Sequence, residues 1–182
     1  MKNGAFFFFV FFYQAIFAGE FKTGDLVFRQ ENTLLSKLFS NIESSEYAHI
    51  GIVWQKSNQA YVVHSEIADG EDGLRVQKWD EFVKNSAKWM VMRPKQIQNS
   101  DKLEEVISKS VRLKPKFNIS FEHNTKNKLY CTQLVQVIYK EALGVNIAPS
   151  MSNYQGRSFI STKDIYSNPV LTQIAKKSKK EE

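Results

Sequence analysis

The sequence predicts an α+β fold, because strand-like segments fill its first half and helix-like segments its second half. From residue 47 to residue 54, the residues at alternate positions form two sets, which is typical of a strand with two different faces. One set is Ala48, Ile50, Ile52 and Trp54, and the other is Tyr47, His49, Gly51 and Val53. After residue 99, apolar residues recur every three or four positions, as on the buried face of a helix. No repeat or low-complexity linker divides residues 20–175, so the 182-residue chain suits one compact domain.

The first half of the chain is expected to form strands joined by short polar turns. The clearest strand covers residues 47–54, and the others are expected over 24–28, 60–66, 74–77 and 89–92. Two glycines and three acidic residues in segment 69–73 predict an exposed loop. Short helical pieces are expected over 32–39 and 80–85.

Two longer helices are expected in the second half. The first covers residues 99–113, where the apolar side chains share one face. The second covers residues 131–143, and Gly144 supplies the left-handed residue that commonly ends a helix. Ser161, followed three residues later by Asp164, predicts the start of a last short helix.

The amino terminus has the composition of a secretory signal. Lys2 precedes an uncharged, phenylalanine-rich run over residues 3–19, and Ala18 offers a cleavage point. The run is shorter than the roughly 20 apolar residues that a membrane-spanning helix needs. We therefore expect a signal peptide over 1–18 and an exported protein, periplasmic or extracellular, with no membrane span after cleavage.

Charge and cysteine content exclude several classes of protein. The chain has 25 Lys and Arg against 19 Asp and Glu, but part of the excess lies in a charged tail over 176–182, outside a single domain over 19–175. The weak excess left on the body does not predict a nucleic-acid-binding stripe. The single cysteine excludes an internal disulfide and a cysteine-rich zinc site. We expect no metal and no cofactor.

That cysteine, Cys131, is the candidate nucleophile. A lone cysteine is usually a small buried hydrophobic residue, but Cys131 falls at the start of a predicted helix. Free amide groups and the helix dipole at such a position favour a thiolate and could hold an oxyanion. The chain offers three histidines as its base, of which His123, in a polar loop, is expected to be solvated surface.

The remaining histidines lie on neighbouring predicted strands. Gly51, two residues after His49 on the same face, leaves room for another group to approach the imidazole. In a hairpin of these strands, His64 could hydrogen-bond His49 and fix its tautomer, as the third member of a catalytic triad does. Glu66 is the other candidate for that role.

Three segments around these residues form a recognisable pattern: Gly-Asp-Leu-Val-Phe over 24–28, Tyr-Ala-His-Ile-Gly-Ile-Val over 47–53 and Tyr-Val-Val-His-Ser over 61–65. Together they resemble the NlpC-like superfamily of papain-fold cysteine hydrolases. The cysteine of Tyr-Cys-Thr-Gln-Leu-Val, over 130–135, follows the histidine instead of preceding it. This order is similar to the circularly permuted YiiX/YebB-like branch, and residues 160–164 resemble its closing segment.

The resemblance implies a permuted papain-like fold, with a small antiparallel sheet or half-barrel packed against helices. It implies Cys131 as nucleophile, His49 as general base and His64 as third residue, with Asp25 and Tyr47 in supporting positions. The chain departs from the branch in having Thr-Gln at 132–133 where Ser-Glu is common, and Phe-Asn at 117–118 where Tyr-Asp is usual.

The function expected is therefore that of an exported cysteine amidase, peptidase or esterase acting on cell-wall peptides or lipids. Its partner is a small-molecule, lipid or peptidoglycan-peptide substrate. The alternative is a catalytically inactive envelope binding module with the same fold. Trp54, Leu34, Leu35 and Leu38 are candidates for an apolar acyl pocket, although core packing explains them better.

Overall fold

A six-stranded antiparallel sheet forms the centre of the computed structural model, which describes residues 21–68, 70–95, 100–122 and 127–178. The strand order is β4-β3-β2-β1-β5-β8, so the chain builds one half of the sheet as consecutive hairpins and then crosses to the other edge. The strands are β1 (Leu26–Glu31), β2 (His49–Lys56), β3 (Gln59–Ala68), β4 (Glu71–Lys78), β5 (Ser86–Pro94) and β8 (Leu171–Ser178). The α+β class expected from the sequence is confirmed.

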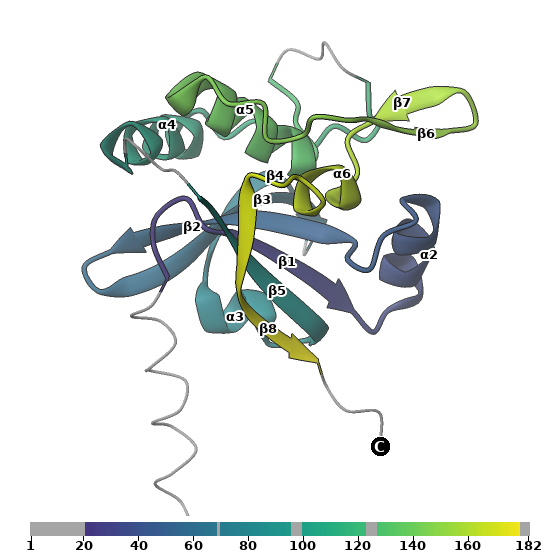
Figure 1. The fold of residues 1–182 in the computed structure, drawn as a ribbon, viewed down its shortest axis with the longest axis horizontal. Coiled ribbons are helices and arrows are strands. Elements are labelled where there is room, and N and C mark those ends of the chain that lie inside the picture. Colours follow the sequence, from purple (N-terminus) through teal and green to yellow (C-terminus); the bar gives the residue numbers. More distant parts are fainter. Residues whose placement is uncertain (1–20, 69, 96–99, 123–126, 179–182) are drawn as a thin grey trace, which may run out of the picture.

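Helices cover both faces of this sheet unequally (Figure 1). The two long helices, α4 (Ser100–Leu113) and α5 (Cys131–Leu143), pack together over one face, and the short α3 (Trp79–Val83) lies on the other. Three further elements lie toward one end of the sheet: α2 (Leu34–Ile42), α6 (Thr162–Tyr166) and a hairpin of β6 (Ser152–Tyr154) with β7 (Arg157–Phe159). Among the described residues, none of the helices is long and apolar enough to cross a bilayer.

The helix ends follow the sequence signals closely. Helix α5 begins at Cys131 and stops before Gly144, whose φ of 68° is the left-handed conformation that glycine adopts without strain. Ser161 caps α6, because its hydroxyl accepts the N–H of Asp164 while the Asp164 carboxylate accepts the N–H of Ser161.

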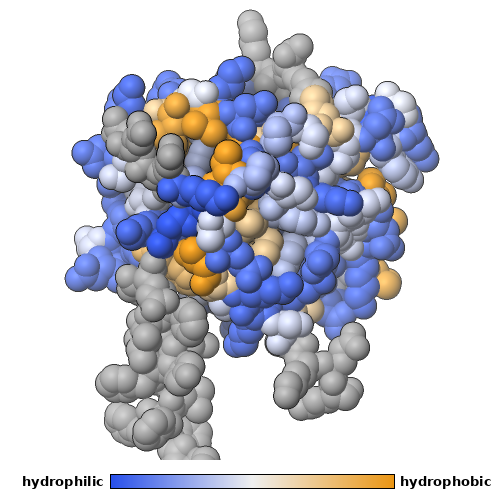
Figure 2. Space-filling view, viewed as in Figure 1, coloured by the Kyte–Doolittle hydropathy of each residue, from blue (hydrophilic) through white to orange (hydrophobic). Residues whose placement is uncertain are grey.

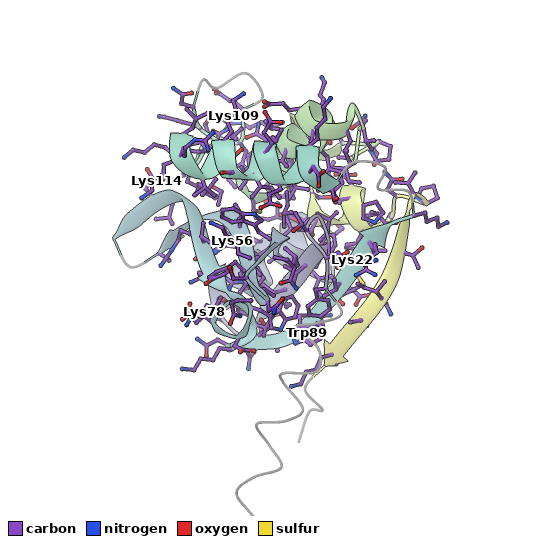
Figure 3. The ribbon with its side chains drawn as sticks, turned by 90° about the vertical axis from the view of Figure 1, so that its left-hand side faces the viewer. Lys22, Lys56, Lys78, Trp89, Lys109 and Lys114 are labelled. Atoms are coloured by element: carbon purple, nitrogen blue, oxygen red, sulfur yellow. The ribbon has the colours of Figure 1, made fainter. Side chains whose placement is uncertain are left out.

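The two faces of the sheet bury two separate apolar clusters. One joins Ile50 and Ile52 of β2 to Leu134 and Ile138 of α5 and also contains Cys131. The other packs aromatic residues of α3 and β5 beneath β2 and β3. In Figure 3, Trp89 of this second cluster lies on the side of the sheet away from α4, while the labelled lysines are spread around the surface. Alternate residues of β2 therefore point into two different clusters, and His49 lies on the face opposite Ile50.

Some boundaries differ from those expected. Segment 69–73 is not an open loop along its whole length, because β4 begins at Glu71 and pairs back to Ala68. The predicted tail over 176–182 is a strand at its start, where Lys176 to Ser178 pair with β5. Residues 179–182 and the predicted signal over 1–18 lie outside the described residues, as does His123.

Candidate active site

Cys131 is the first residue of α5, and its side chain is 8% exposed. The helix reaches the sheet where β2 and β3 separate: their pairing begins only at Gly51 and His64. On the β3 side of this opening, the Ser65 hydroxyl donates to the carbonyl of Leu129, two residues before the cysteine. On the β2 side, the backbone N–H of Ile50 faces the sulfur and lowers its pKa. The structure therefore brings the helix start to within one residue of His49.

His49, His64 and Gln77 form a chain of hydrogen bonds across β2, β3 and β4. The His49 Nε2 and His64 Nδ1 atoms are 2.9 Å apart, and His64 Nε2 lies 3.0 Å from Oε1 of Gln77. Because the Gln77 oxygen only accepts, it fixes the hydrogen of His64 on Nε2, so Nδ1 of His64 accepts from His49. His49 then carries its hydrogen on Nε2 and leaves Nδ1 as a free basic nitrogen.

Glu66 flanks this chain without belonging to it. Its Oε2 atom lies 3.8 Å from both His49 Nε2 and His64 Nδ1, beyond hydrogen-bond distance. The same oxygen accepts from Arg29 at 2.8 Å, and Oε1 accepts from Arg75 at 3.3 Å. Of the two candidates left open by the sequence, His64 is the one hydrogen-bonded to His49 in this structure.

No hydrogen bond joins the Cys131 sulfur to the His49 ring in this structure. The ring packs on the opposite face of the sheet from α5, with its centroid 5.8 Å from that of Phe82. The sulfur lies in the cluster on the α5 face, next to the backbone N–H of Ile50. Hydrogen bonds needed for catalysis are often long or misaligned in the absence of substrate, so the separation leaves the pairing possible after a ring rotation.

Burial keeps both groups uncharged. It raises the pKa of the Cys131 thiol to about 12, and the charge of Glu43 adds to the effect, while the N–H groups of Ile50, Thr132 and Cys131 oppose it. Burial and the nearby Arg29 guanidinium hold the pKa of His49 well below its usual range and lower that of His64 to about 3. The helix terminus alone predicted a thiolate; burial outweighs it, because the sulfur is removed from water.

Three of the residues that depart from the branch pattern hold the start of α5, and two of them, Asn118 and Gln133, contact each other. Gln133 accepts at Oε1 from the side-chain amide of Asn118 at 3.0 Å and from the backbone N–H of Tyr130 at 3.4 Å. The Thr132 hydroxyl donates to the carbonyl of Ile160 at 2.7 Å. The two amide side chains thus form a neutral pair beside the cysteine, where two carboxyl groups would repel each other when ionised.

The two supporting residues lie apart from the histidine chain. Asp25 is fully buried, and its carboxylate holds Arg93 in two hydrogen bonds of 2.7 and 2.8 Å. Its carbonyl pairs with Val53, four residues along β2 from His49, or roughly 13 Å at 3.3 Å per residue. Tyr47 packs in the cluster on the α5 face, where its buried hydroxyl has no hydrogen-bond partner among the described residues. Burial raises its pKa to about 12.

Glu43 is a residue near the nucleophile that the sequence did not single out. It caps the end of α2, is buried, and accepts at Oε2 from the backbone N–H and the hydroxyl of Thr162 at 2.9 and 2.8 Å. Burial raises the pKa of its carboxyl to about 7, against the lowering effect of those two hydrogen bonds. Only the tertiary structure places this carboxyl near Cys131, since 88 residues separate the two in the chain.

Comparison with known proteins agrees with this fold. Residues 20–172 match the family model described as permuted papain-like amidase enzyme, YaeF/YiiX, C92 family. The fold is similar to the crystal structure of the metalloprotein YiiX from Escherichia coli O157:H7, with a TM-score of 0.74, 18% identity, and coverage of 87% of this chain and 98% of that one. The search of curated proteins gave no match.

The similar crystal structure is that of a metalloprotein, and three side chains of this chain carry atoms of the kind that bind a cation. The donors of His49, His64 and Glu66 all lie within 4.8 Å of one another. However, the Glu66 oxygen nearest both histidines already binds Arg29, and Arg75 holds the other oxygen. Burial is the main cause of the low pKa of His49, and the Arg29 guanidinium that adds to it would repel a metal ion as well. In this arrangement the three residues do not fit a metal site.

Proposed function

Because the chain belongs to the permuted papain-like amidase family YaeF/YiiX, C92, we propose that it is a cysteine hydrolase that cleaves an amide or ester bond with Cys131, His49 and His64. Cys131 is the nucleophile, His49 the general base, and His64 the residue that fixes the orientation of His49. The substrate is a peptide of the cell wall or a lipid of the envelope, and the protein is exported.

In the proposed mechanism the resting pair is a neutral thiol and a neutral imidazole. Nδ1 of His49 takes the thiol proton as the sulfur attacks the carbonyl carbon, so that a free thiolate never accumulates. The backbone N–H groups of Cys131 and Thr132 stabilise the oxyanion. The His49 imidazolium then protonates the leaving amine or alcohol, and water attacks the acyl-enzyme to release the acid and restore the thiol.

The observation that carries this proposal is the hydrogen bond between His49 and His64. With Nε2 bonded to His64, His49 keeps Nδ1 as the nitrogen that could take the thiol proton once the ring turns toward α5. The protonated imidazole would also gain from Glu66, 3.8 Å from His49 Nε2. Burial and Arg29 keep the pKa of His49 low in the resting state, and the negative charge that develops on the oxyanion would raise it.

The competing reading is an inactive envelope binding module. A binding module has no chemical use for a nucleophile near a histidine chain, which favours the enzyme. The two readings differ in turnover: a hydrolase releases product, whereas a binding module only retains its ligand.

The test is hydrolysis of a panel of muropeptides, N-acyl amides and phospholipids by the purified protein. We expect turnover of at least one class, its loss in Cys131→Ala, and a fall in kcat of roughly 10² in His49→Ala. His123→Ala, which removes the histidine outside the triad, is the matched control and should retain turnover. Circular dichroism checks that each variant folds. Turnover that persists in Cys131→Ala would refute the nucleophile, and no turnover of any class would favour the binding module.

A further inference from the structure

Arg29 is a buried cation beside the histidine chain. Hydrophilic residues cover much of the face drawn in Figure 2, as is usual because charged side chains are mostly exposed. Among the described residues, Arg29 is the only lysine or arginine that is buried, with 8% of its surface exposed. Burying a charge costs stability unless its partners compensate, so the partners of Arg29 indicate what the charge does there.

The pairing of β1 with β2 places this side chain next to His49. Arg29 and His49 lie directly opposite each other in the antiparallel pair, so their side chains share one face of the sheet. Nη1 of Arg29 donates to the carbonyl of Phe82 at 2.7 Å, and the guanidinium carbon lies 4.2 Å from the centre of the Phe82 ring. The His49 ring packs on the same phenylalanine. Helix α3 therefore holds the guanidinium at the histidines.

The other terminal nitrogen of Arg29 holds Glu66. Nη2 donates to Oε2 of Glu66 at 2.8 Å. This oxygen is also the one that lies 3.8 Å from both His49 Nε2 and His64 Nδ1. Arg75 donates to the other oxygen of Glu66, Oε1, at 3.3 Å. Of the two arginines, Arg29 is therefore the one hydrogen-bonded to the oxygen nearest the histidines.

The guanidinium is not fully matched by its partners. Its Nε–H is buried and has no hydrogen-bond acceptor among the described residues. Nη2 is shared between Glu66 and Glu31, whose carboxylate lies 3.2 Å away. A buried donor without an acceptor lowers stability, and such a group in a folded protein needs an explanation. The explanation offered by the contacts is the position that Arg29 gives to Glu66.

Without Arg29, three donor atoms would be arranged as metal ligands. The distances among His49 Nε2, His64 Nδ1 and Glu66 Oε2 are 2.9, 3.8 and 3.8 Å. Four-coordinate zinc with bonds of about 2.0–2.1 Å holds its ligand atoms about 3.3 Å apart. Two histidines and one carboxylate are also a ligand set of catalytic zinc sites. The cation bound to this triangle is instead the guanidinium of Arg29.

We propose that Arg29 is a positioning residue that takes the place of a metal ion at His49, His64 and Glu66. Its guanidinium binds the carboxylate, keeps divalent cations out and leaves the two imidazoles to bond each other. The role in catalysis rests on the proposed hydrolase, because a metal ion on Nε2 would break the hydrogen bond that orients His49. The exclusion of metal ions does not depend on turnover.

The test is Zn²⁺ binding, measured by isothermal titration calorimetry at pH 7.5 without substrate. All proteins carry Cys131→Ala, so that the thiol contributes no ligand. The protein with Arg29 intact should bind Zn²⁺ no more tightly than its His64→Gln variant. Arg29→Met should bind one Zn²⁺ at least roughly 10²-fold more tightly, because a like charge a few Å away is removed. Adding His64→Gln to Arg29→Met should abolish this gain.

The matched control is Arg75→Met, which removes the other arginine bound to Glu66. It should leave the Zn²⁺ affinity near that of the protein with Arg29 intact, because Oε2 stays bonded to Arg29. Arg29→Lys keeps a positive charge and should also keep Zn²⁺ out, which separates the effect of charge from that of packing.

Tight Zn²⁺ binding by the protein with Arg29 intact, lost in His64→Gln, would overturn the proposal, and this comparison needs no Arg29 variant to fold. Equal gains in Arg29→Met and Arg75→Met would overturn it as well. So would the absence of a gain in an Arg29→Met protein that circular dichroism shows to be folded. A failure to hydrolyse any substrate would count against the proposed function and leave these binding results unchanged.

Discussion

Replacing Glu43 with glutamine should change how the stability of this protein depends on pH. The glutamine oxygen can still accept the two hydrogen bonds from Thr162, so the substitution removes the ionisable group and little else. In the wild type, burial raises the pKa of this carboxyl from the ordinary 4.5 to about 7.

The magnitude follows from that difference in pKa. Below pH 4.5 the carboxyl is protonated in both the folded and the unfolded chain, and its stabilising effect is fully present. Between pH 4.5 and pH 7 the unfolded chain releases the proton while the folded chain keeps it, so the free energy of unfolding falls as pH rises. At 1.36 kcal/mol per pKa unit, the wild type should lose about 2–3 kcal/mol more than Glu43→Gln between pH 5 and pH 8.

The assay is urea denaturation of both proteins at pH 5, 6, 7 and 8. The contributions of titratable groups other than Glu43 cancel when the free energy of unfolding of one protein is subtracted from that of the other. The free energy of unfolding of Glu43→Gln should rise relative to that of the wild type as pH rises, with most of the change before pH 7.5. The variant should also label faster with iodoacetamide, since the Glu43 charge that raises the pKa of Cys131 is gone. Parallel stability curves over this range would refute the claim that Glu43 is a buried carboxyl with a raised pKa.

Three further predictions concern the site and its support. Between pH 7 and pH 4, the free energy of unfolding of His64→Gln should fall by about 3 kcal/mol less than that of the wild type. Burial lowers the pKa of His64 from 6.5 to about 3, so in this range the histidine takes up a proton only when the chain unfolds. Equal acid sensitivity of the two proteins in urea titrations would contradict this. Gly51→Ala should destabilise the fold by about 1–3 kcal/mol, since a Cβ there would lie 2.4 Å from Cγ1 of Val62. An unchanged urea midpoint would contradict this and show that β3 moves to accommodate the added methyl group. Dialysis against EDTA should leave hydrolysis unchanged, because Arg29 and Arg75 hold the carboxylate that a metal would need; activity restored only by added metal would show that Glu66 exchanges these partners.

Local signals predicted much of the secondary structure. The cap at Ser161 and the stop at Gly144 lie where the sequence placed them, because a cap hydrogen bond and a positive φ depend on a few neighbouring residues. The β6–β7 hairpin and β8 were missed. Strand β8 carries exposed polar residues along most of its length, so its pairing with β5 leaves little trace in the hydrophobic pattern.

The sequence by itself determined the chemistry available to this protein: one thiol at a helix start, and two histidines on adjacent strands in a hairpin. These depend on residue identity and short spacing, which the chain carries directly. Only the tertiary structure decided their state. It buried the thiol and both imidazoles, placed Arg29 beside the histidines and Glu43 beside the sulfur, and so made all three groups neutral. Burial and the distances between charges arise from packing between segments far apart in the chain, and a local pattern cannot specify them.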